Sequence, residues 1–208
     1  MIAGKLSDNF PLVVWQTGSG TQSNMNANEV LAGRGNAILG EKLLHPNDDV
    51  NMSQSSNDTF PTAMHIAAVL ALEETVLPAI DVLTAAFARL EQENRGIVKS
   101  GRTHLQDATP IAFSQEISGW RTSLERDRQL ISLALDPLRE LALGGTAVGT
   151  GLNAPKGFDA LVAEKVSALT GKRFVTAPNK FHALTSKDEL VFAHGAIKAA
   201  ACDMMKIA

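Results

Sequence analysis

The 208-residue sequence contains one cysteine and no tyrosine, and only 5% of its residues are aromatic. Cys202 therefore cannot form a disulfide within the chain, which favours a reducing compartment, most simply the cytoplasm. Met1 is followed by no apolar stretch of the length that a signal peptide or a membrane span requires. Because 45% of the residues are hydrophobic, we expect a globular cytoplasmic protein that does not enter a membrane.

The sequence also lacks a strong excess of one charge. Its 22 acidic and 19 basic residues give a net charge of −3 and are scattered along the chain. A nucleic-acid-binding stripe or a membrane-binding face would require basic residues gathered together. Nucleic acid is therefore not an expected partner, and an anionic ligand would have to be held by local geometry.

Apolar residues recur at three- and four-residue steps in three stretches, 72–90, 117–138 and 190–208. This spacing predicts long helices, and the abundance of Ala and Leu favours close packing between them. Pro78 should bend the first helix without ending it, because the pattern continues in phase on both sides. We therefore predict a mostly all-α fold built on a long-helix bundle.

Two histidines and the cysteine lie in segments that we expect to be helical. His65 and His194 lie on apolar helical faces, where a hydrogen-bonded core histidine is the expected role. Cys202 has no basic neighbour that would generate a thiolate, so we interpret it as a packing residue. The third pattern is still in phase at Ala208, so we expect the natural helix to continue beyond this residue.

The first polar segment contains the run Thr17–Asn24, which is rich in Gly and Ser. It lacks the Gly-Lys-Ser/Thr ending of a phosphate-binding loop. The hydroxyls of Ser19 and Thr21, ahead of a predicted helix near Asn24, suit a carboxylate. The alternative is a flexible turn followed by a helix cap.

The second segment, His45–Asp58, gathers many short polar side chains before a helix. His45, Asp48 and Asp49 resemble a set of metal ligands, but no second histidine follows at a helical spacing, so we expect no metal. Ser55, Ser56 and Asn57 are neutral donors just ahead of the helix. That position suits an anion, and it is equally typical of helix caps.

The third segment, Gly101–Pro110, places His104 beside Arg102, Thr103 and Asp107 at the expected entrance to a helix. Histidine titrates near neutral pH, so it can carry a proton in acid–base catalysis. A simple hydrogen-bonding role is the alternative. A fourth segment, Gly144–Asn153, superficially resembles a dinucleotide-binding fingerprint, but we expect it to follow a helix and to lack the surrounding βαβ unit.

Taken together and in this order, several blocks of the sequence resemble class II fumarases, over a region that runs from about Phe10 to the C-terminus. The blocks are Thr17–Asn24, His45–Asn51, Ser53–Asp58, Gly101–Pro110, Gly144–Asn153 and Ala177–Phe181. The resemblance implies the central helical domain of the fumarase/aspartase superfamily. It also implies fumarate hydratase activity in the tricarboxylic acid cycle, with fumarate and L-malate as the small dicarboxylate substrates and without a cofactor.

Other members of the superfamily are alternatives to this assignment. Aspartases resemble the chain throughout, but they usually carry Gln at the position of His104 and Thr at the position of Ser56. Argininosuccinate and adenylosuccinate lyases keep only fragments of these blocks. A helical assembly module without catalysis is the remaining alternative.

The resemblance also implies roles for individual residues. Substrate-binding groups would be Ser19, Thr21, Ser55, Ser56, Asn57 and Thr103, and the catalytic acid would be His104. His45, Asn47 and Asp48 match a second, non-catalytic anion site of the family. Removing the carbon-bound proton of malate creates an aci-carboxylate, whose extra negative charge needs fixed hydrogen-bond donors. The hydroxyl then leaves as water, which requires a proton donor such as His104.

The resemblance further predicts that the chain is part of a longer enzyme. Residues 1–55 would be the end of an N-terminal domain, and residues 56–208 an incomplete central helical bundle. The family's serine loop, which is thought to remove the proton, and its Lys-x-Asn pair have no counterpart in this sequence. Class II fumarases build each active site from three subunits of a homotetramer. We therefore expect these 208 residues to be inactive alone.

Overall fold

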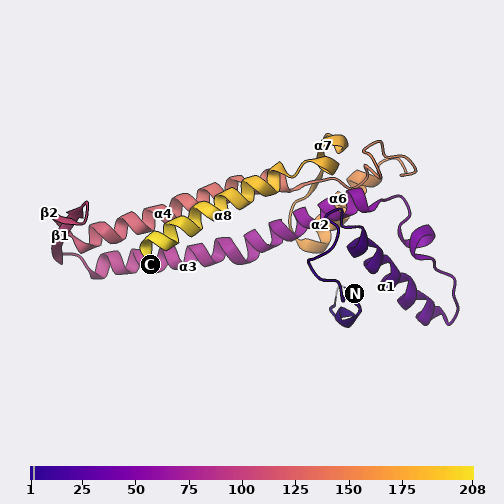
Figure 1. Ribbon diagram of the computed structural model, residues 1–208, viewed down its shortest axis with the longest axis horizontal. Coiled ribbons are helices and arrows are strands. Elements are labelled where there is room, and N and C mark those ends of the chain that lie inside the picture. The colour runs from indigo at the N-terminus through magenta and orange to yellow at the C-terminus, as the bar shows by residue number, and fades with distance from the viewer. Residues whose placement is uncertain (2) are drawn as a thin grey trace. The chain divides into compact units, whose positions relative to one another are not determined.

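A computed structural model describes residue 1 and residues 3–208, and the chain forms two compact units. One unit comprises residues 1–67 and 139–187, and the other comprises residues 68–138 and 188–208. The structure is mostly helical (Figure 1), which confirms the predicted fold class. The predicted domain boundary between residues 55 and 56 stays a prediction.

The first unit contains three longer helices and several short elements. In chain order these are a 3-10 turn (Ser7–Asn9), α1 (Thr21–Leu39), the π-helical turn η2 (Pro46–Val50), the start of α2 (Ser56–Ala71), β3 (Glu140–Leu141), α6 (Phe158–Thr170), β4 (Val175–Thr176) and α7 (Lys180–Thr185). Strands β3 and β4 pair in parallel across the α6 connection. The expectations that Gly144–Asn153 follows a helix and lacks a surrounding βαβ unit are both wrong, because the segment follows β3 and lies within the β3–α6–β4 connection, although each strand has only two residues. Two residues are too few to show a strand pattern, and the apolar residues before the segment read as part of a helix.

Polar side chains of α2 attach this helix to the backbone of residues 140–146. Asp58, Thr62 and His65 lie at helical spacing and are all buried. The Nδ1 atom of His65 lies 3.0 Å from the carbonyl oxygen of Glu140, and the Thr62 hydroxyl accepts a hydrogen bond from the Leu143 N–H at 2.9 Å. The prediction of a hydrogen-bonded core histidine at position 65 is therefore confirmed.

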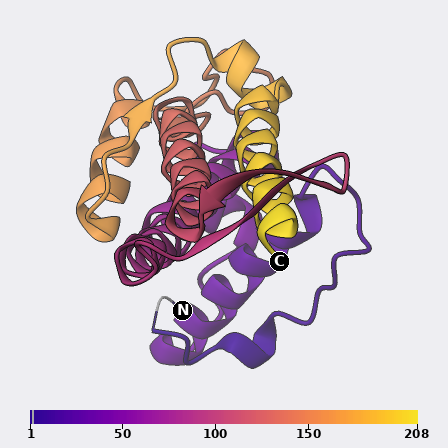
Figure 2. The same cartoon turned by 90° about the vertical axis from the view of Figure 1, so that its left-hand side faces the viewer.

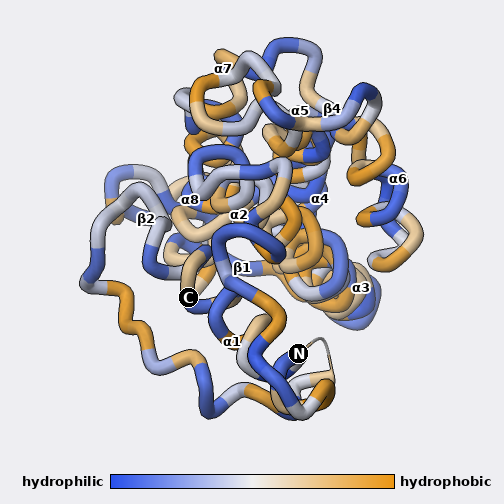
Figure 3. Tube along the Cα trace, turned by 90° about the vertical axis from the view of Figure 1, so that its right-hand side faces the viewer, coloured by the Kyte–Doolittle hydropathy of each residue, from blue (hydrophilic) through white to orange (hydrophobic). Residues whose placement is uncertain are grey.

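The second unit is built around three long helices. Its elements are α3 (Leu77–Glu93), β1 (Val98–Thr103), β2 (Gln106–Ala112), α4 (Phe113–Leu133), α5 (Leu135–Leu138) and α8 (Asp188–Ile207). Figures 1 and 2 show α3, α4 and α8 side by side, as the three apolar patterns predict. Leu124, Ile131 and Leu138 are fully buried in its core. Figure 3 shows hydrophobic and hydrophilic segments alternating along the helices, which is typical of helices with one buried face.

The chain stays helical through Pro78, as predicted. Residues 56–93 are helical throughout, and a π-helical turn, η3 (Leu72–Val76), separates α2 from α3. Pro78 is the second residue of α3, in its first turn, where a missing N–H is tolerated. The proline therefore coincides with a local change in the hydrogen-bond ladder, as expected where one residue cannot donate.

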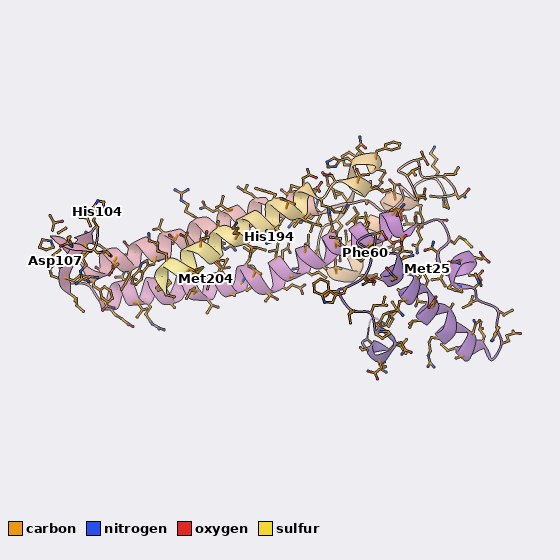
Figure 4. The ribbon with its side chains drawn as sticks, viewed as in Figure 1. Met25, Phe60, His104, Asp107, His194 and Met204 are labelled. Carbon is orange, nitrogen blue, oxygen red and sulfur yellow. The ribbon has the colours of Figure 1, made fainter. Side chains whose placement is uncertain are left out.

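Helix α8 buries a different face from the one that its apolar pattern predicts. Its buried residues are Ala193, Ala196 and Ala200, whereas His194 is exposed, so the prediction of a core histidine there is wrong. Small alanine side chains allow close approach of α8 to its neighbour α4. Figure 4 shows His194 and Met204 along this helix. In the part of the chain that the structure describes, no helix is long and apolar enough to cross a membrane.

The larger side chains of α8 border an apolar groove instead of filling the core. The groove has a volume of about 310 Å³. It is lined by Thr75, Val76, Ala79, Ile80 and Leu83 before and along α3, by Leu124 and Ile131 of α4, and by Ile197, Ala200, Ala201 and Met204 of α8. Ile197 and Met204 remain 40% and 49% exposed, so this apolar surface is only partly covered within the chain.

A β-hairpin joins α3 to α4, where the sequence predicts only a polar loop leading into a helix. Strands β1 and β2 are antiparallel, with Thr103 opposite Gln106. His104 and Leu105 form the two-residue turn and have φ angles of 49° and 63°. His104 therefore lies in a hairpin turn and not at the entrance to α4, which begins at Phe113. Gly101 and Pro110, which disfavour strands, conceal this hairpin in the sequence.

The positive φ angle of Leu105 can be tested by substitution, because its side chain is 93% exposed. Leucine in the left-handed region costs roughly 1 kcal/mol, and asparagine tolerates this conformation better. We expect Leu105→Asn to stabilise the hairpin by up to about 1 kcal/mol, measured as slower hydrogen exchange at the amides of residues 103 and 106. Leu152→Asn, at an exposed site without a positive φ, is the control. Unchanged exchange at the hairpin would contradict the prediction.

A second prediction concerns Asp127, a buried carboxyl on α4 whose Oδ2 atom has no hydrogen-bond partner among the described residues. Burial, together with the nearby Asp203, raises the pKa of Asp127 above its usual value of 3.8. The folded state thus holds this proton more tightly than the unfolded state, and its stability falls as pH rises above 3.8. We expect Asp127→Asn to raise the free energy of unfolding by about 1 kcal/mol at pH 7.

Thermal unfolding of both proteins between pH 4 and pH 8 checks this expectation. The gain from Asp127→Asn should grow with pH, because the substitution removes the buried negative charge. Glu164→Gln is the control, since Glu164 is an exposed carboxylate. An equal gain at both ends of the pH range would show that the buried charge is not the cause.

Candidate functional site

The first unit brings together hydroxyl groups from two distant segments. Oxygen–oxygen distances are 3.3 Å between Thr17 and Ser19, 3.2 Å between Ser19 and Thr21, and 3.2 Å between Thr21 and Ser56. Thr21 is the first residue of α1 and Ser56 is the first residue of α2. Three predicted substrate-binding residues therefore lie in one cluster, although 35 positions separate Thr21 from Ser56.

This cluster depends on Gly20, the residue before α1. Gly20 has a φ of 76°, and a Cβ atom placed on it would lie 2.0 Å from the ring of Phe60. Only glycine satisfies both constraints, so it allows α1 to begin against the aromatic ring of α2. The N-terminal ends of both helices thus contribute to the cluster, and helix N-termini favour negative charge.

Ser55 and Asn57 flank the start of α2 and are held by local hydrogen bonds. The Ser55 hydroxyl accepts from the Asn57 backbone N–H at 3.3 Å. The Asn57 side chain donates through Nδ2 to the carbonyl oxygen of Ala147 at 2.8 Å, which joins α2 to the glycine-rich segment. Asn57 is therefore fixed in orientation although it is exposed.

A cavity of about 560 Å³ opens beside these groups. It is lined by Gly18, Ser19, Asn57, Phe60, Pro61, Met64, Ala147, Val148, Leu184, Thr185 and Lys187. Ser19 and Asn57 provide neutral hydrogen-bonding groups, and Lys187 is the cation of this lining. The Lys187 ammonium donates to the carbonyl oxygens of Leu184 and Ser186. The cavity therefore combines polar donors with apolar walls, as small-molecule sites commonly do.

Two charged residues of the first unit, Asp58 and Lys180, do not line this cavity and are engaged by the protein itself. Asp58 is fully buried, which raises its pKa, while the N–H groups of Ser55, Thr146 and Gly144 oppose this rise. Burial lowers the pKa of Lys180, and the negative charges of Asp159 and Asp58 oppose that change. Both groups bind atoms of the protein, so the groups that can contact an external anion are those of the lining, namely Ser19, Asn57 and Lys187.

Thr103 and His104 belong to the hairpin of the second unit. Figure 4 shows His104 and Asp107 on this hairpin. Asp107 pairs with Arg102, at 3.3 Å between the carboxylate and Nε, and therefore does not orient His104. The imidazole is exposed and makes no hydrogen bond to any residue that the structure describes. It is accessible to a ligand or to another chain.

The predicted second anion site lies at the start of η2. His45 Nδ1 accepts from the N–H groups of Asn47 and Asp48, at 3.3 and 3.4 Å. The Asp48 carboxylate lies 3.2 Å from the same nitrogen, and Asp49 accepts from the His45 N–H at 2.7 Å. Side chains of the protein thus already satisfy several donors at this helix start, and anion binding there stays a prediction.

Sequence reasoning missed the buried side chains that attach α2 to the glycine-rich segment. Asp58 and Thr62 bind the backbone of residues 143–146, which approaches α2 from far along the chain. One signal was available, because Ser55 and Asp58 have the three-residue spacing of a capping box, in which the later side chain accepts from the N–H of the first residue. The structure contains that bond at 2.9 Å.

The chain is similar over its whole length to known proteins. The chain is 61% identical to class II fumarate hydratase of Bacillus anthracis and 60% identical to that of Bacillus subtilis. Each alignment covers 100% of this chain but 46% of the relative, so the chain spans about half the length of the curated relatives it matches.

Solved structures give the same result. A crystal structure of recombinant class II fumarase from Schistosoma mansoni matches with a TM-score of 0.95 and 40% identity, over 99% of this chain and 47% of that one. A fumarate lyase:delta crystallin structure from Brucella melitensis matches with a TM-score of 0.94 and 37% identity, over 99% and 46%. A family model described as "Lyase" matches residues 1–208, so the chain belongs to the lyase family.

Proposed function

We propose that these residues contribute to a fumarate hydratase, which interconverts fumarate and L-malate. The observation that carries the proposal is the cluster of Ser19, Thr21 and Ser56 hydroxyls at the starts of two helices. Neutral donors and helix N-termini can hold a carboxylate without a large basic patch, in keeping with the net charge of −3. The similarity to class II fumarate hydratases supports the same assignment.

The chemistry assigns different tasks to the two groups of residues. The donors Ser19, Thr21, Ser55, Ser56 and Asn57, with Thr103, would stabilise the extra negative charge of the aci-carboxylate. His104, or a water molecule that it polarises, would protonate the departing hydroxyl. Its exposed imidazole is free to meet a substrate held by another part of the assembly.

The proton on carbon must be removed by a base. Among the described residues that line the cavity, Lys187 is the one with an ionisable side chain. Its ammonium already donates hydrogen bonds to two backbone carbonyl oxygens. We therefore infer that the base does not come from this cavity lining, and that the chain alone is inactive. Recognition without a base stabilises ground state and transition state alike, which does not accelerate the reaction.

Aspartate ammonia-lyase is the second candidate, because it shares the fold and leaves the same product. His104 and Ser56 favour the hydratase, since aspartases usually carry Gln and Thr there. We further propose a cytoplasmic enzyme of the tricarboxylic acid cycle, with His45, Asn47 and Asp48 forming a second anion site. A helical assembly module without catalysis is the remaining alternative.

A hybrid enzyme tests the proposed activity. Residues 1–208 would replace the matching segment of the Bacillus subtilis class II fumarate hydratase, which is 60% identical. We expect the hybrid to hydrate fumarate. The reaction is monitored as the loss of the ultraviolet absorbance of fumarate. In this hybrid His104→Gln should lower turnover by roughly 100-fold, the usual scale for losing a positioned proton carrier.

Asp107→Asn in the same hybrid is the matched control, because it breaks the hairpin ion pair and leaves the imidazole in place. Turnover of this control should stay within a few-fold of the parent hybrid. If His104→Gln behaves like the control, His104 is not the acid. Addition of ammonia to fumarate by the parent hybrid would instead favour the aspartase assignment.

We also propose that the chain assembles into a homotetramer with shared active sites. The partly exposed apolar groove along α3, α4 and α8 supports this proposal, because such surfaces are commonly covered by another chain. Sedimentation at micromolar concentration should detect dimers or tetramers. Met204→Glu places a charge in the groove and should shift the protein towards monomers.

Met205→Glu is the matched control for this experiment. Met205 follows Met204 on the same helix but is 81% exposed and does not line the groove. It should leave the association unchanged. A stable monomer of the parent chain would rule out assembly through this surface.

A further inference from the structure

We propose that Asp58 is a positioning residue that holds Asn57 in the orientation needed to bind a substrate carboxylate. The inference rests on the proposed function for its ligand, but its structural basis is independent. Asp58 does not line the cavity, and its side chain is completely buried. It therefore acts through other groups and does not touch the substrate.

The Asp58 carboxylate connects two segments that are far apart in sequence. Its Oδ1 atom accepts from the N–H of Ser55 at 2.9 Å, at the start of α2. Its Oδ2 atom accepts from the N–H groups of Gly144 and Thr146, at 3.0 and 2.8 Å. Hydrogen bonds to a carboxylate are stronger than those between neutral groups, so this contact fixes the start of the helix against the glycine-rich segment.

A second hydrogen bond joins the start of α2 to the glycine-rich segment, beside the bonds of Asp58. Asn57 precedes Asp58, Ala147 follows Thr146, and the Asn57 side chain donates to the Ala147 carbonyl at 2.8 Å. A carboxamide has two N–H donors and one acceptor oxygen. Because one N–H is held by Ala147, the remaining groups of Asn57 have a defined direction beside the cavity that Asn57 lines.

The glycine-rich segment needs this restraint because its backbone is strained. Thr146 has a φ of 56° and is buried, and non-glycine residues adopt this conformation only when the surroundings hold them there. The hydrogen bond from its N–H to Asp58 is such a constraint. Loss of the carboxylate would allow residues 144–147 to relax, and the Ala147 carbonyl that orients Asn57 would move with them.

Thr62 provides a matched comparison. It is also buried on α2 and also accepts from the same backbone segment, through the Leu143 N–H at 2.9 Å. It lies four residues further along the helix and contacts neither Asn57 nor Ala147 by any hydrogen bond that the described residues form. Thr62→Val and Asp58→Asn both keep the side-chain shape. The carboxamide introduced by Asp58→Asn has one acceptor oxygen and an amide group, so it cannot accept from all three N–H donors in the same geometry.

The test measures fumarate binding to the 208-residue chain by nuclear magnetic resonance titration at constant ionic strength. The variants are Asp58→Asn, Thr62→Val, Asn57→Ala and the double variant Asp58→Asn/Asn57→Ala. We expect Asp58→Asn and Asn57→Ala each to raise the dissociation constant roughly 10-fold, on the scale of one lost charge-assisted hydrogen bond. The double variant should bind no more than about two-fold more weakly than Asn57→Ala, because both changes remove one effect.

We expect both Thr62→Val and Asp58→Asn to lower the melting temperature. Thr62→Val should nevertheless keep the dissociation constant within about two-fold of the parent, since its effect is on folding alone. Fully multiplicative losses in the double variant would overturn the inference, as would unchanged binding by Asp58→Asn. Equal losses of binding in Thr62→Val and Asp58→Asn would also overturn it, because they would indicate a general structural role.

Hydrogen exchange separates this inference from the proposed function. Asp58→Asn should speed amide exchange in residues 144–147 whether or not fumarate binds, because the restraint is internal. If the parent chain shows no saturable fumarate binding, the proposed ligand is wrong and the positioning role for it is overturned as well. Faster amide exchange in Asp58→Asn would then still establish that Asp58 restrains residues 144–147. Unchanged exchange would overturn this structural role as well.

Discussion

The buried carboxylate of Asp58 is the contact on which the first unit depends. Its two oxygens accept hydrogen bonds from N–H groups at the start of α2 and in the glycine-rich segment, so one side chain satisfies three backbone donors that are buried or partly buried. Thr62 and His65 continue the same attachment along α2. Burial of these three side chains is tolerated because each is matched to a backbone partner.

The same attachment explains why the candidate binding groups can be neutral. Asp58 and Lys180 do not line the cavity and are engaged by the protein, while the Ser19 hydroxyl and the Asn57 amide line it. Fixed neutral dipoles need little reorganisation when negative charge develops on a ligand. Charge that holds the protein together is thus separated from the groups that would meet the substrate.

Periodicity predicted the long helices well, because a run of apolar residues at three- and four-residue steps has few alternatives. It failed on the orientation of α8, where Ala193, Ala196 and Ala200 follow the same spacing as the larger residues beside them. Alanine is only weakly hydrophobic, so a pattern based on large side chains selected the wrong face. The hairpin of residues 98–112 was missed because its strands contain Gly and Pro.

The candidate site was predictable in part for a similar reason. Local segments such as Ser55–Asn57 have a recognisable position before a helix, but nothing local brings Thr21 to Ser56. That proximity follows from contacts between the first turns of α1 and α2, where the Thr59 hydroxyl also donates to the Asn24 side chain at 2.9 Å. The motif blocks that resemble a known family indicated it only indirectly. Asp58 escaped notice because its partners, Gly144 and Thr146, contribute backbone atoms, which leave no trace in residue identity.

Gly20 shows how such packing restricts the routes by which the sequence can evolve. A side chain there meets two separate obstacles, a φ of 76° and the Phe60 ring at 2.0 Å. A smaller residue at position 60 would remove the collision but leave the backbone strain, and a relaxed backbone would redirect α1 away from Ser56. No single compensating substitution removes both obstacles, so this position is closed to gradual change.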